Sequence, residues 1–528
     1  MKWNNVLCIY PYRYRNPYYA FPPLALEYLA GAIEDIVEKV TLVDLRFEKD
    51  IKPYFKDVDI VATFGHFEDC AIFGQLKEDS LLEIAELLPK GIPLITGGTV
   101  SLDIEATFKR CKRLNIVIRG NPEYPVRELF LKGSPEGVKN LVYRNNGELI
   151  FNESYTYPIS NEILPARHLR RYEYQVWGIS CDILKTSMGC NYRCSFCYQY
   201  GKGFETKYLK WQGRTPDSIF KELQSSNAVF VGFMDDDLLV DMERIDKLCD
   251  LVISSKMKKL FAGNSRTNYI IKRGKTLKKM EKAGFIGMSY GIESPYDKTL
   301  KLYKKGTTPA INEEALRLMN KTNMLLISSF ILGSPGETKE EILYYLQYAR
   351  KFDIDSVVTN RLRIPEDTEL YKQLFNLQTG ELKDPKYKMV EGKELEEIKY
   401  AIKYGQRTPL RILLILMKLS RHKGMFISPL YILISFLNTA IKGSAAERIF
   451  VIRWLLGIFM AISRSKPWRM FERFLAIILY QPVKIINQAF ELLDAKLNLS
   501  IKILPKVFNI LHHKVYEKQK FQHGWKKG

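Results

Sequence analysis

Three cysteines lie within eight residues of one another in the segment GCNYRCSFCYQY, which spans residues 189–200. Cys190, Cys194 and Cys197 follow the spacing C-x3-C-x2-C, so a single loop can bring three thiolates to one metal centre. Structural zinc normally takes four ligands in two separated pairs, and no second Cys or His pair follows at such a spacing. Three adjacent thiolates suit a [4Fe-4S] cluster whose remaining iron is open to a ligand from outside the protein.

The cysteine spacing, with Phe196 directly before the last cysteine, resembles the signature of the radical S-adenosylmethionine (SAM) superfamily. The resemblance implies that the open iron binds the amino and carboxylate groups of SAM. It also implies that an electron donor such as ferredoxin or flavodoxin reduces the cluster, and that SAM cleavage gives a 5′-deoxyadenosyl radical. On this interpretation Cys190, Cys194 and Cys197 are both the metal ligands and the catalytic centre.

The core of that superfamily is a partial (β/α)6 barrel, and the chain after the cysteines fits a series of strand–helix units. Three apolar, β-branched runs end near Asp235, Glu293 and Gly333. Thr338 with Glu341 has the pattern of a capping box, which indicates the start of a helix after the last of these runs. The order of these elements supports the resemblance beyond the cysteine loop.

The resemblance also assigns SAM contacts to single positions. In the superfamily, acids after the second strand contact the SAM amino group, an arginine is often found on a strand near SAM, and a glycine-rich turn lies near the adenine. The cofactor-binding positions that match are Phe196, Asp235, Asp236, Arg266, Glu293, Gly333, Pro335 and Gly336.

The first 130 residues alternate β-branched runs with helical stretches, which is typical of a doubly wound parallel sheet. Gly97 and Gly98 end one of these runs, at the edge where such folds bind ligands, and are candidate binding residues for a large flat ligand or a phosphate. No GxGxxG follows the first strand, which argues against a nicotinamide cofactor. We expect strands at residues 5–11, 40–45, 59–65, 92–98 and 115–120.

An α/β domain directly before such a core resembles the radical SAM class with a cobalamin-binding domain. Its members include anaerobic magnesium-protoporphyrin monomethyl ester cyclases, hopanoid methylases and enzymes that modify archaeal tetraether lipids. The segments 21–35 and 95–102 resemble that class. The element D-x-H-x-x-G, whose histidine ligates cobalt in many corrinoid enzymes, is absent after the first strand, and we interpret His66 as a core or rim histidine. Cobalamin therefore stays open as a third cofactor.

The sequence thus predicts an α/β protein in four parts. These are a Rossmann-like, cobalamin-binding-like domain (1–135), a linker (136–179), a radical SAM barrel (180–385) and a basic amphipathic helical region (386–528). The resemblance covers about residues 1–380. Most of the eight cysteines are scattered, which argues against a secreted disulfide framework and favours the cytoplasm.

The last quarter of the chain carries most of the positive charge. Residues 401–528 hold 22 Lys and Arg against 5 Asp and Glu, which leaves only +4 of the net charge of +21 for the rest. The longest uncharged apolar run, 426–441, is shorter than the ~20 residues that span a bilayer. We expect in-plane amphipathic helices at an anionic membrane surface, on the inner face of the cell membrane. A helical bundle with a solvated basic face is the alternative, and long Leu/Ile runs argue against nucleic acid as the partner.

These observations favour an enzyme that modifies an unactivated carbon of a membrane lipid by methylation, ring formation or head-group attachment. A second hypothesis is a methylthiotransferase or methyltransferase that acts on RNA, for which Cys8, Cys70 and Cys111 would have to hold a second cluster. A third, of another class, is a sensor with a cluster that does no catalysis.

Overall fold

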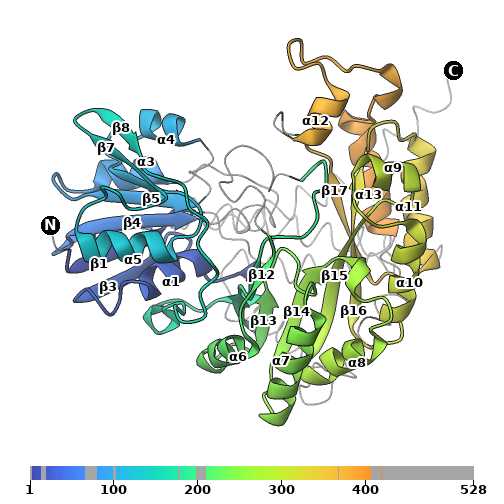
Figure 1. The fold of residues 1–528 in the computed structure, drawn as a ribbon, viewed down its shortest axis with the longest axis horizontal. Helices are drawn as coiled ribbons and strands as arrows, with labels where there is room; N and C mark the ends of the chain where they lie inside the picture. The colour runs from blue at the N-terminus through green and yellow to red at the C-terminus, as the bar shows by residue number, and fades with distance from the viewer. Residues whose placement is uncertain are drawn as a thin grey trace, which may run out of the picture. The chain divides into compact units, whose positions relative to one another are not determined.

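The computed structural model describes residues 3–13, 19–65, 80–98, 103–176, 179–197, 210–364, 366, 368–405, 415 and 418 (Figure 1). These residues form two large β-sheets, each covered by helices, and one small two-stranded sheet. Both the doubly wound domain and the partial barrel expected from the sequence are confirmed.

The first sheet has the strand order β3-β1-β4-β5-β6-β7-β8. Its first five strands are parallel, and β7 and β8 are antiparallel. The order reverses between β1 and β4, which is where open α/β sheets bind ligands. The strands are β1 (Asn5–Tyr10), β3 (Lys39–Asp44), β4 (Ile60–Gly65), β5 (Leu94–Gly98), β6 (Ile116–Ile118), β7 (Leu141–Asn145) and β8 (Glu148–Phe151).

Helices cover both faces of the first sheet, as the alternating pattern predicts. Helices α1 (Leu24–Gly31) and α5 (Glu123–Lys132) pack on one face. Helices α3 (Leu81–Leu87) and α4 (Ile104–Arg110) pack on the other. The two apolar cores on opposite faces are separate, because successive side chains of each strand point to opposite sides.

The segment that we expected to be a linker, 136–179, contains the β7–β8 hairpin, which extends the first sheet. The turn between these strands consists of Asn146 and Gly147, both with positive φ (47° and 89°). Asn-Gly is the preferred pair for a two-residue turn of this kind, and it is the sequence signal that would have revealed the hairpin. The same segment also carries the 3-10 helix η3 (Arg167–Leu169).

The second sheet has the strand order β17-β16-β15-β14-β13-β10-β9-β2. Six neighbouring strands are parallel: β10, β13, β14, β15, β16 and β17. At the β10 edge, β9 and β2 are added in antiparallel orientation. The strands are β2 (Tyr19–Ala20), β9 (Gln175–Val176), β10 (Ile179–Leu184), β13 (Phe230–Phe233), β14 (Leu260–Ser265), β15 (Phe285–Glu293), β16 (Leu325–Leu332) and β17 (Ser356–Arg361). The small sheet pairs β11 (Ser187–Met188) with β12 (Gln212–Gly213).

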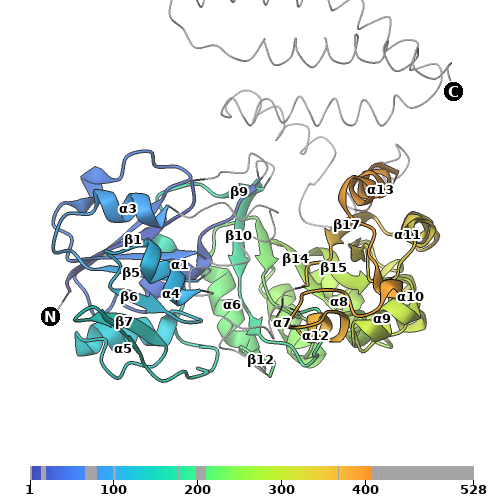
Figure 2. The ribbon, with the colours of Figure 1, turned by 90° about the horizontal axis from the view of Figure 1, so that it is seen from above.

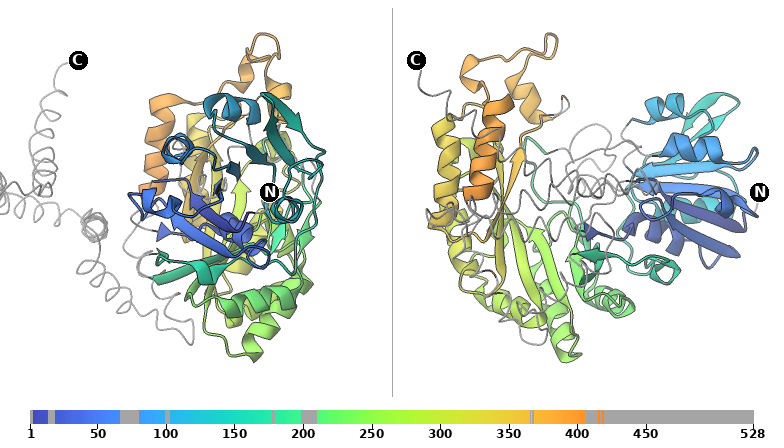
Figure 3. Two further views of the ribbon diagram at one scale, coloured as in Figure 1. Left: turned by 90° about the vertical axis from the view of Figure 1, so that its left-hand side faces the viewer. Right: turned by 180° about the vertical axis from the view of Figure 1, so that it is seen from behind.

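Helices follow the parallel strands and lie along one side of the second sheet (Figure 1), as the views from above and from behind also show (Figures 2 and 3). Most of them bury one continuous apolar core between helix and sheet, and α12 packs in a separate apolar cluster with Tyr303. The capping box of Thr338 and Glu341 is present as expected. The helices are α6 (Pro216–Ser225), α7 (Met242–Ser254), α8 (Gly274–Ala283), α9 (Asp297–Leu302), α10 (Pro309–Met319), α11 (Lys339–Lys351), α12 (Glu369–Leu374) and α13 (Gly392–Gly405).

Among the described residues, no helix combines the length and the hydropathy that crossing a bilayer requires. The amphipathic helices expected after residue 408 lie outside the described residues, apart from Ile415 and Lys418. Lys418 forms an ion pair with Asp355, 2.5 Å from Nζ to Oδ2, directly before β17.

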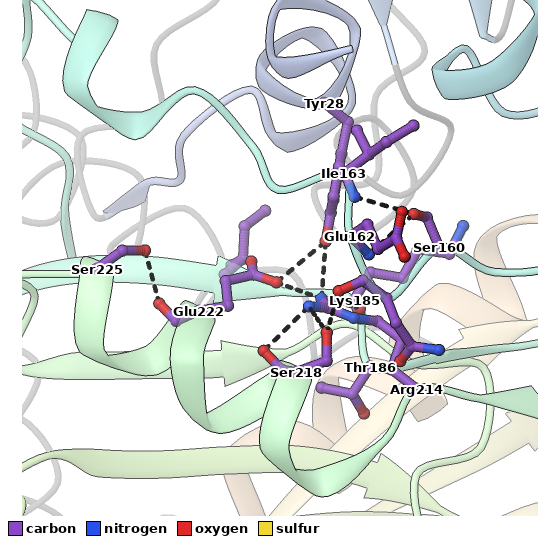
Figure 4. Close-up of polar contacts among 12 residues, drawn as sticks. Tyr28, Ser160, Glu162, Ile163, Lys185, Thr186, Arg214, Ser218, Glu222 and Ser225 are labelled. Atoms are coloured by element: carbon purple, nitrogen blue, oxygen red, sulfur yellow. Dashed lines mark hydrogen bonds and ion pairs between the residues drawn. The ribbon is translucent and has the colours of Figure 1, made fainter.

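A buried charge network joins α1 to the barrel. Arg214 is 1% exposed and donates to Tyr28 Oη of α1 (3.1 Å), to Ser218 Oγ (2.8 Å) and to the carboxylate of Glu222 (Figure 4). Glu222 lies on α6, and its Oε1 forms a second ion pair, with Arg167 Nη2 at 2.7 Å. One carboxylate of the first barrel helix is therefore shared by two guanidinium groups.

The network continues from Arg167 to the first strand of the barrel. Asp182 of β10 accepts from Arg167 Nε and from Arg170 Nη2, each at 2.7 Å. Arg170 in turn forms a two-bond ion pair with Glu27 of α1, at 2.6 and 2.7 Å. Burial alone would raise the pKa of Asp182, but the two guanidinium groups outweigh it and lower that pKa. Three carboxylates thus balance three guanidinium groups, and the network is neutral.

Glu222→Gln should lower the free energy of unfolding by about 3–5 kcal/mol, because the substitution leaves two buried guanidinium groups without their shared carboxylate. Denaturant unfolding monitored by circular dichroism measures this change. Asp297→Asn is the matched control: it breaks an exposed i,i+4 pair with Lys301 and should change stability by less than ~0.5 kcal/mol. Equal effects of the two variants would contradict a stabilising role for the network.

Candidate active site

The cysteine loop follows β11 and is fixed to the barrel at both ends. The Gly189 N–H donates to Oδ2 of Asp236 at 2.8 Å, and Asp236 lies in the turn that follows β13. At the other end, the Ser195 N–H donates to the Tyr303 carbonyl (2.9 Å) and Ser195 Oγ donates to the Leu302 carbonyl (2.8 Å), at the end of α9. Each of these hydrogen bonds has a backbone group on at least one side, and the Asp236 carboxylate and the Ser195 hydroxyl supply the side-chain partners.

The three cysteines differ in exposure. Cys194 is buried at 9% exposure, and Cys190 and Cys197 are half-buried. The Cys197 N–H donates to the Cys194 carbonyl at 3.0 Å, which makes a tight turn between these two thiols. Burial raises the pKa of Cys190 to about 11, so that thiol holds its proton at neutral pH and must release it when a metal binds.

The run Asp235–Asp237 follows β13, where we expected it, and its members have different partners. Asp235 is buried and accepts from the Thr186 N–H (2.9 Å), from Thr186 Oγ1 (3.0 Å) and from Ser187 Oγ (2.7 Å). It therefore holds the connection from β10 to β11 in place. Asp236 accepts from the cysteine loop, as described above, and the proposed contacts of both residues with SAM remain predictions.

Asp237 was not among the predicted site residues, although it belongs to the same acidic run. It is fully buried, and Oδ1 accepts from Ser265 Oγ (2.5 Å) and from the Arg266 N–H (3.2 Å). Its other oxygen lies 3.9 Å from Cys190 Sγ. Burial raises the pKa of Asp237. The acidic run alone does not indicate that Asp237 lies against the cysteine loop, because the loop is distant in sequence.

Arg266 was expected on a strand, and that expectation was wrong by one residue. Strand β14 ends at Ser265, and Arg266 begins the turn into η5 (Thr267–Tyr269). Because it lies past the end of the strand, its side chain reaches the cysteine loop, and Nη1 donates to Cys194 Sγ at 3.3 Å.

Glu293 ends β15 in the left-handed region, with φ of 60°. Its Oε1 accepts from Lys305 Nζ at 2.7 Å, and both side chains are buried. No sequence pattern pointed to Lys305, which lies after α9 and meets Glu293 only in the folded chain. The pair places one positive and one negative charge at the edge of the barrel where the carboxyl ends of its strands lie.

The glycine-rich turn 333–336 follows β16 and is connected to the cysteine loop through Tyr303. The Phe196 ring lies 4.8 Å from the Tyr303 ring in an edge-on arrangement. The Tyr303 hydroxyl and Ser334 Oγ are 2.5 Å apart, and the Ser334 N–H donates to Glu337 Oε2 at 3.0 Å. Pro335 lies within this turn. The structure thus brings Phe196 and the turn into one packed unit.

Gly97 and Gly98 end β5, where packing against β4 accounts for both glycines. A Cβ on Gly97 would lie 2.3 Å from the Phe64 ring, and one on Gly98 would lie 1.8 Å from the Gly65 carbonyl oxygen. A binding role for these residues remains a prediction. His66 and Cys70 lie outside the described residues.

Within the part of the chain that the structure describes, no three Cys, His, Asp or Glu side chains form a group ready to hold a metal ion. The donor chemistry nevertheless fits an iron–sulfur cluster: three thiols lie on one anchored loop, and a buried guanidinium faces one of them. Two nitrogens of that guanidinium, Arg266 Nε and Nη2, are buried without a hydrogen-bond partner. Orphaned buried donors at this point suit an anionic group such as a thiolate-ligated cluster.

A parallel half-barrel with a three-cysteine loop at the carboxyl ends of its strands defines the class of protein. Residues 184–349 match the model of the Radical SAM superfamily, so this part of the chain is a radical SAM domain. The chain therefore contains a radical SAM domain, and the cofactors of that superfamily are a [4Fe-4S] cluster and SAM.

The chain is similar to several known proteins. It is 28% identical over 360 residues to an uncharacterized methyltransferase of Pyrococcus horikoshii, covering 63% of this chain and 74% of that protein. It is 22% identical to the anaerobic magnesium-protoporphyrin IX monomethyl ester cyclase of Cereibacter sphaeroides, covering 61% of this chain and 55% of the cyclase. It is 28% identical over 199 residues to the hopanoid C-2 methylase of Rhodopseudomonas palustris, covering 36% of this chain and 37% of the methylase.

Among solved structures, the fold is similar to that of OxsB, a cobalamin-dependent SAM radical enzyme whose structure holds aqua-cobalamin and SAM. The TM-score is 0.60 at 17% identity, and the match covers 100% of this chain and 85% of that chain. The likeness extends the agreement in fold beyond the radical SAM domain.

Gly336→Ala should lower the free energy of unfolding by about 1–3 kcal/mol, because its φ of 77° is strained for alanine and the new Cβ would lie 2.9 Å from the Lys386 carbonyl oxygen. We expect weaker SAM binding by equilibrium dialysis as well, since the turn would shift. Gly274→Ala is the control: nothing lies within 4 Å of its Cβ position, so stability should stay the same or rise. A stable Gly336→Ala protein with unchanged SAM affinity would contradict a role for the turn.

Proposed function

We propose that this enzyme cleaves SAM reductively and modifies an unactivated carbon of a membrane lipid, with cobalamin as a third cofactor. The observation that carries the radical SAM part is the anchoring of the cysteine loop to the ends of β13 and α9, with Arg266, Glu293 and the turn 333–336 at the same edge. The lipid part rests on the composition of the last quarter of the chain. The reactions that we consider are methylation, ring formation and head-group attachment.

Each group of residues has a distinct task in this proposal. Cys190, Cys194 and Cys197 would hold the cluster, which when bound supplies the electron for SAM cleavage. Phe196, Asp236 and Glu293 would orient SAM, and the turn 333–336 would pack against its adenine. Asp237 and Glu293 are buried, which suits a site from which water is excluded.

Two observations support a lipid substrate at a membrane surface. The balance of +17 in residues 401–528 lies among long Leu/Ile runs, which suits peripheral contact with anionic lipid at the inner face of the cell membrane. One relative, the hopanoid C-2 methylase, is named for a lipid substrate. Radical SAM enzymes also need an electron donor, for which a ferredoxin or flavodoxin is the expected partner.

Cobalamin as the third cofactor is supported by the fold of the N-terminal domain. Its order β3-β1-β4-β5-β6 gives a ligand site at the point where the strand order reverses. The similarly folded OxsB binds cobalamin. Methyl transfer to an unactivated carbon would then be the favoured outcome.

A methylthiotransferase that acts on RNA is disfavoured by the positions of Cys8 and Cys111. Cys8 packs in the core on one face of the first sheet, and Cys111 packs in the core on the other. Burial raises the pKa of Cys8 to about 12. Two thiols on opposite faces of a sheet cannot ligate one cluster, so the second cluster that this function needs would lack its proposed ligands.

Anaerobic purification after growth with cobalamin should yield about four irons per chain, the content of one cubane cluster, together with bound cobalt. We expect 5′-deoxyadenosine formation from SAM under reduction to rise when polar-lipid extract is added. About eight irons without cobalt would instead support the methylthiotransferase, and no SAM cleavage at all would support a sensor. Absence of any lipid effect would overturn the lipid substrate.

Neutralising four basic residues of the tail, Arg448, Arg453, Arg464 and Lys466, to Gln should weaken binding to anionic vesicles about a thousandfold, at ~1 kcal/mol for each charge. Sedimentation with vesicles of phosphatidylglycerol and phosphatidylcholine measures the partition. The control replaces four exposed basic residues at α8 with Gln: Arg273, Lys275, Lys278 and Lys282. If both variants lost binding equally, the contact would reflect total charge and not the tail.

A further inference from the structure

Arg266 places a buried cation against the cysteine loop. Its side chain is 6% exposed, Nη1 donates to Cys194 Sγ at 3.3 Å, and Cζ lies 3.5 Å from the centroid of the Tyr192 ring. The N–H of the same residue donates to Asp237 Oδ1, which fixes the backbone from which the side chain extends. A hydrogen bond from a charged donor and a cation–π contact therefore act on the loop together.

The Tyr192 ring is itself held in place on its other sides. Gly306 has φ of 66°, and a Cβ there would lie 2.8 Å from the Tyr192 ring, so the ring packs directly on that backbone. Tyr269 meets the ring edge-on at 6.2 Å between centroids. Asn268 Nδ2 donates to the Gly306 carbonyl at 2.8 Å and so helps to fix this backbone. The guanidinium group thus lies on a rigid aromatic surface.

Only part of the hydrogen-bonding capacity of Arg266 is used by the protein. Nε and Nη2 are buried without a partner, which is costly for a charged group unless another anion completes the site. The nearest anion that the proposed function brings here is the cluster with its three thiolates. This geometry differs from the SAM contact that the resemblance implies for Arg266, since the arginine is directed at a cluster ligand.

We propose that Arg266 is a positioning residue for the iron–sulfur cluster, which donates to the Cys194 thiolate and raises the reduction potential of the cluster. This inference rests on the proposed radical SAM function. One-electron reduction adds a negative charge to the cluster, and a fixed cation stabilises the reduced form more than the oxidised form. Hydrogen bonds to the ligating sulfurs and net charge are known determinants of cluster potentials.

The test is a redox titration of the full-length reconstituted protein, followed by electron paramagnetic resonance of the reduced cluster. Arg266→Met should make the potential more negative, with the ratio of oxidised to reduced cluster at a fixed potential rising at least tenfold, which corresponds to about 59 mV for one electron. Arg266→Lys keeps the charge but loses the forked donor, so it should give a smaller shift in the same direction.

The matched control is Arg244→Met. Arg244 is also buried, stacks 5.1 Å over the Trp211 ring and has an unpartnered Nε, but its Nη1 donates to the Thr186 carbonyl at 2.9 Å and not to a cysteine. Its loss should leave the potential unchanged. A shift as large as that of Arg266→Met would mean a general effect of lost charge and would overturn the inference.

The outcomes separate this inference from the proposed function. If the natural protein takes up no four-iron cluster, the proposed function fails. If it holds the cluster and Arg266→Met has an unchanged potential, only the role of Arg266 is overturned. Should Arg266→Met bind no cluster, Arg266→Lys decides: an unchanged potential overturns the role, and a more negative one supports it.

Discussion

The interaction on which the rest of the structure depends is the neutral network of six charges that joins α1, β10 and α6, five of them buried and Arg170 half-buried. Each carboxylate in it serves a guanidinium group from another element, so the network fixes relative positions that apolar packing alone would leave adjustable. Because β10 leads through the short strand β11 into the cysteine loop, this fixed start also sets where the loop begins. Buried ion pairs are weak sources of net stability, and their retention here fits a role in specifying one arrangement.

A second constraint acts at the other end of the loop, where Ser195 forms hydrogen bonds with backbone groups of later segments. The Leu302 and Tyr303 carbonyls accept from Ser195, and the Leu370 N–H donates to the Ser195 carbonyl at 2.9 Å. The loop is therefore linked to α9 and α12, which are over a hundred residues later in the sequence. Tyr303 carries this connection onward through its hydroxyl to the glycine-rich turn. Cysteines on one loop and glycines after β16 thus become parts of one site.

The residues of the site are of two kinds: those expected to contact a cofactor, and those that hold the cysteine loop in its conformation. Asp235 uses both of its oxygens on Thr186 and Ser187, and so acts on the shape of the loop. Arg266 and the Glu293–Lys305 pair carry charge to the edge where an anionic cluster and SAM are expected. The buried carboxylates here are matched by donors, which allows charged groups to remain in a site shielded from water.

The sequence by itself determined the elements and the chemical class. Five strands of the first domain and the capping box at Thr338 follow from periodicity and cap chemistry, which are local properties. The cysteine spacing was equally local, since all three thiols lie on one loop. The missed hairpin at Asn146 was also encoded locally. Only the tertiary structure decided that Arg266 meets Cys194, that Lys305 pairs with Glu293, and that Cys8 and Cys111 lie on opposite faces of a sheet. These contacts join distant segments, and their geometry depends on how strands align in the folded chain.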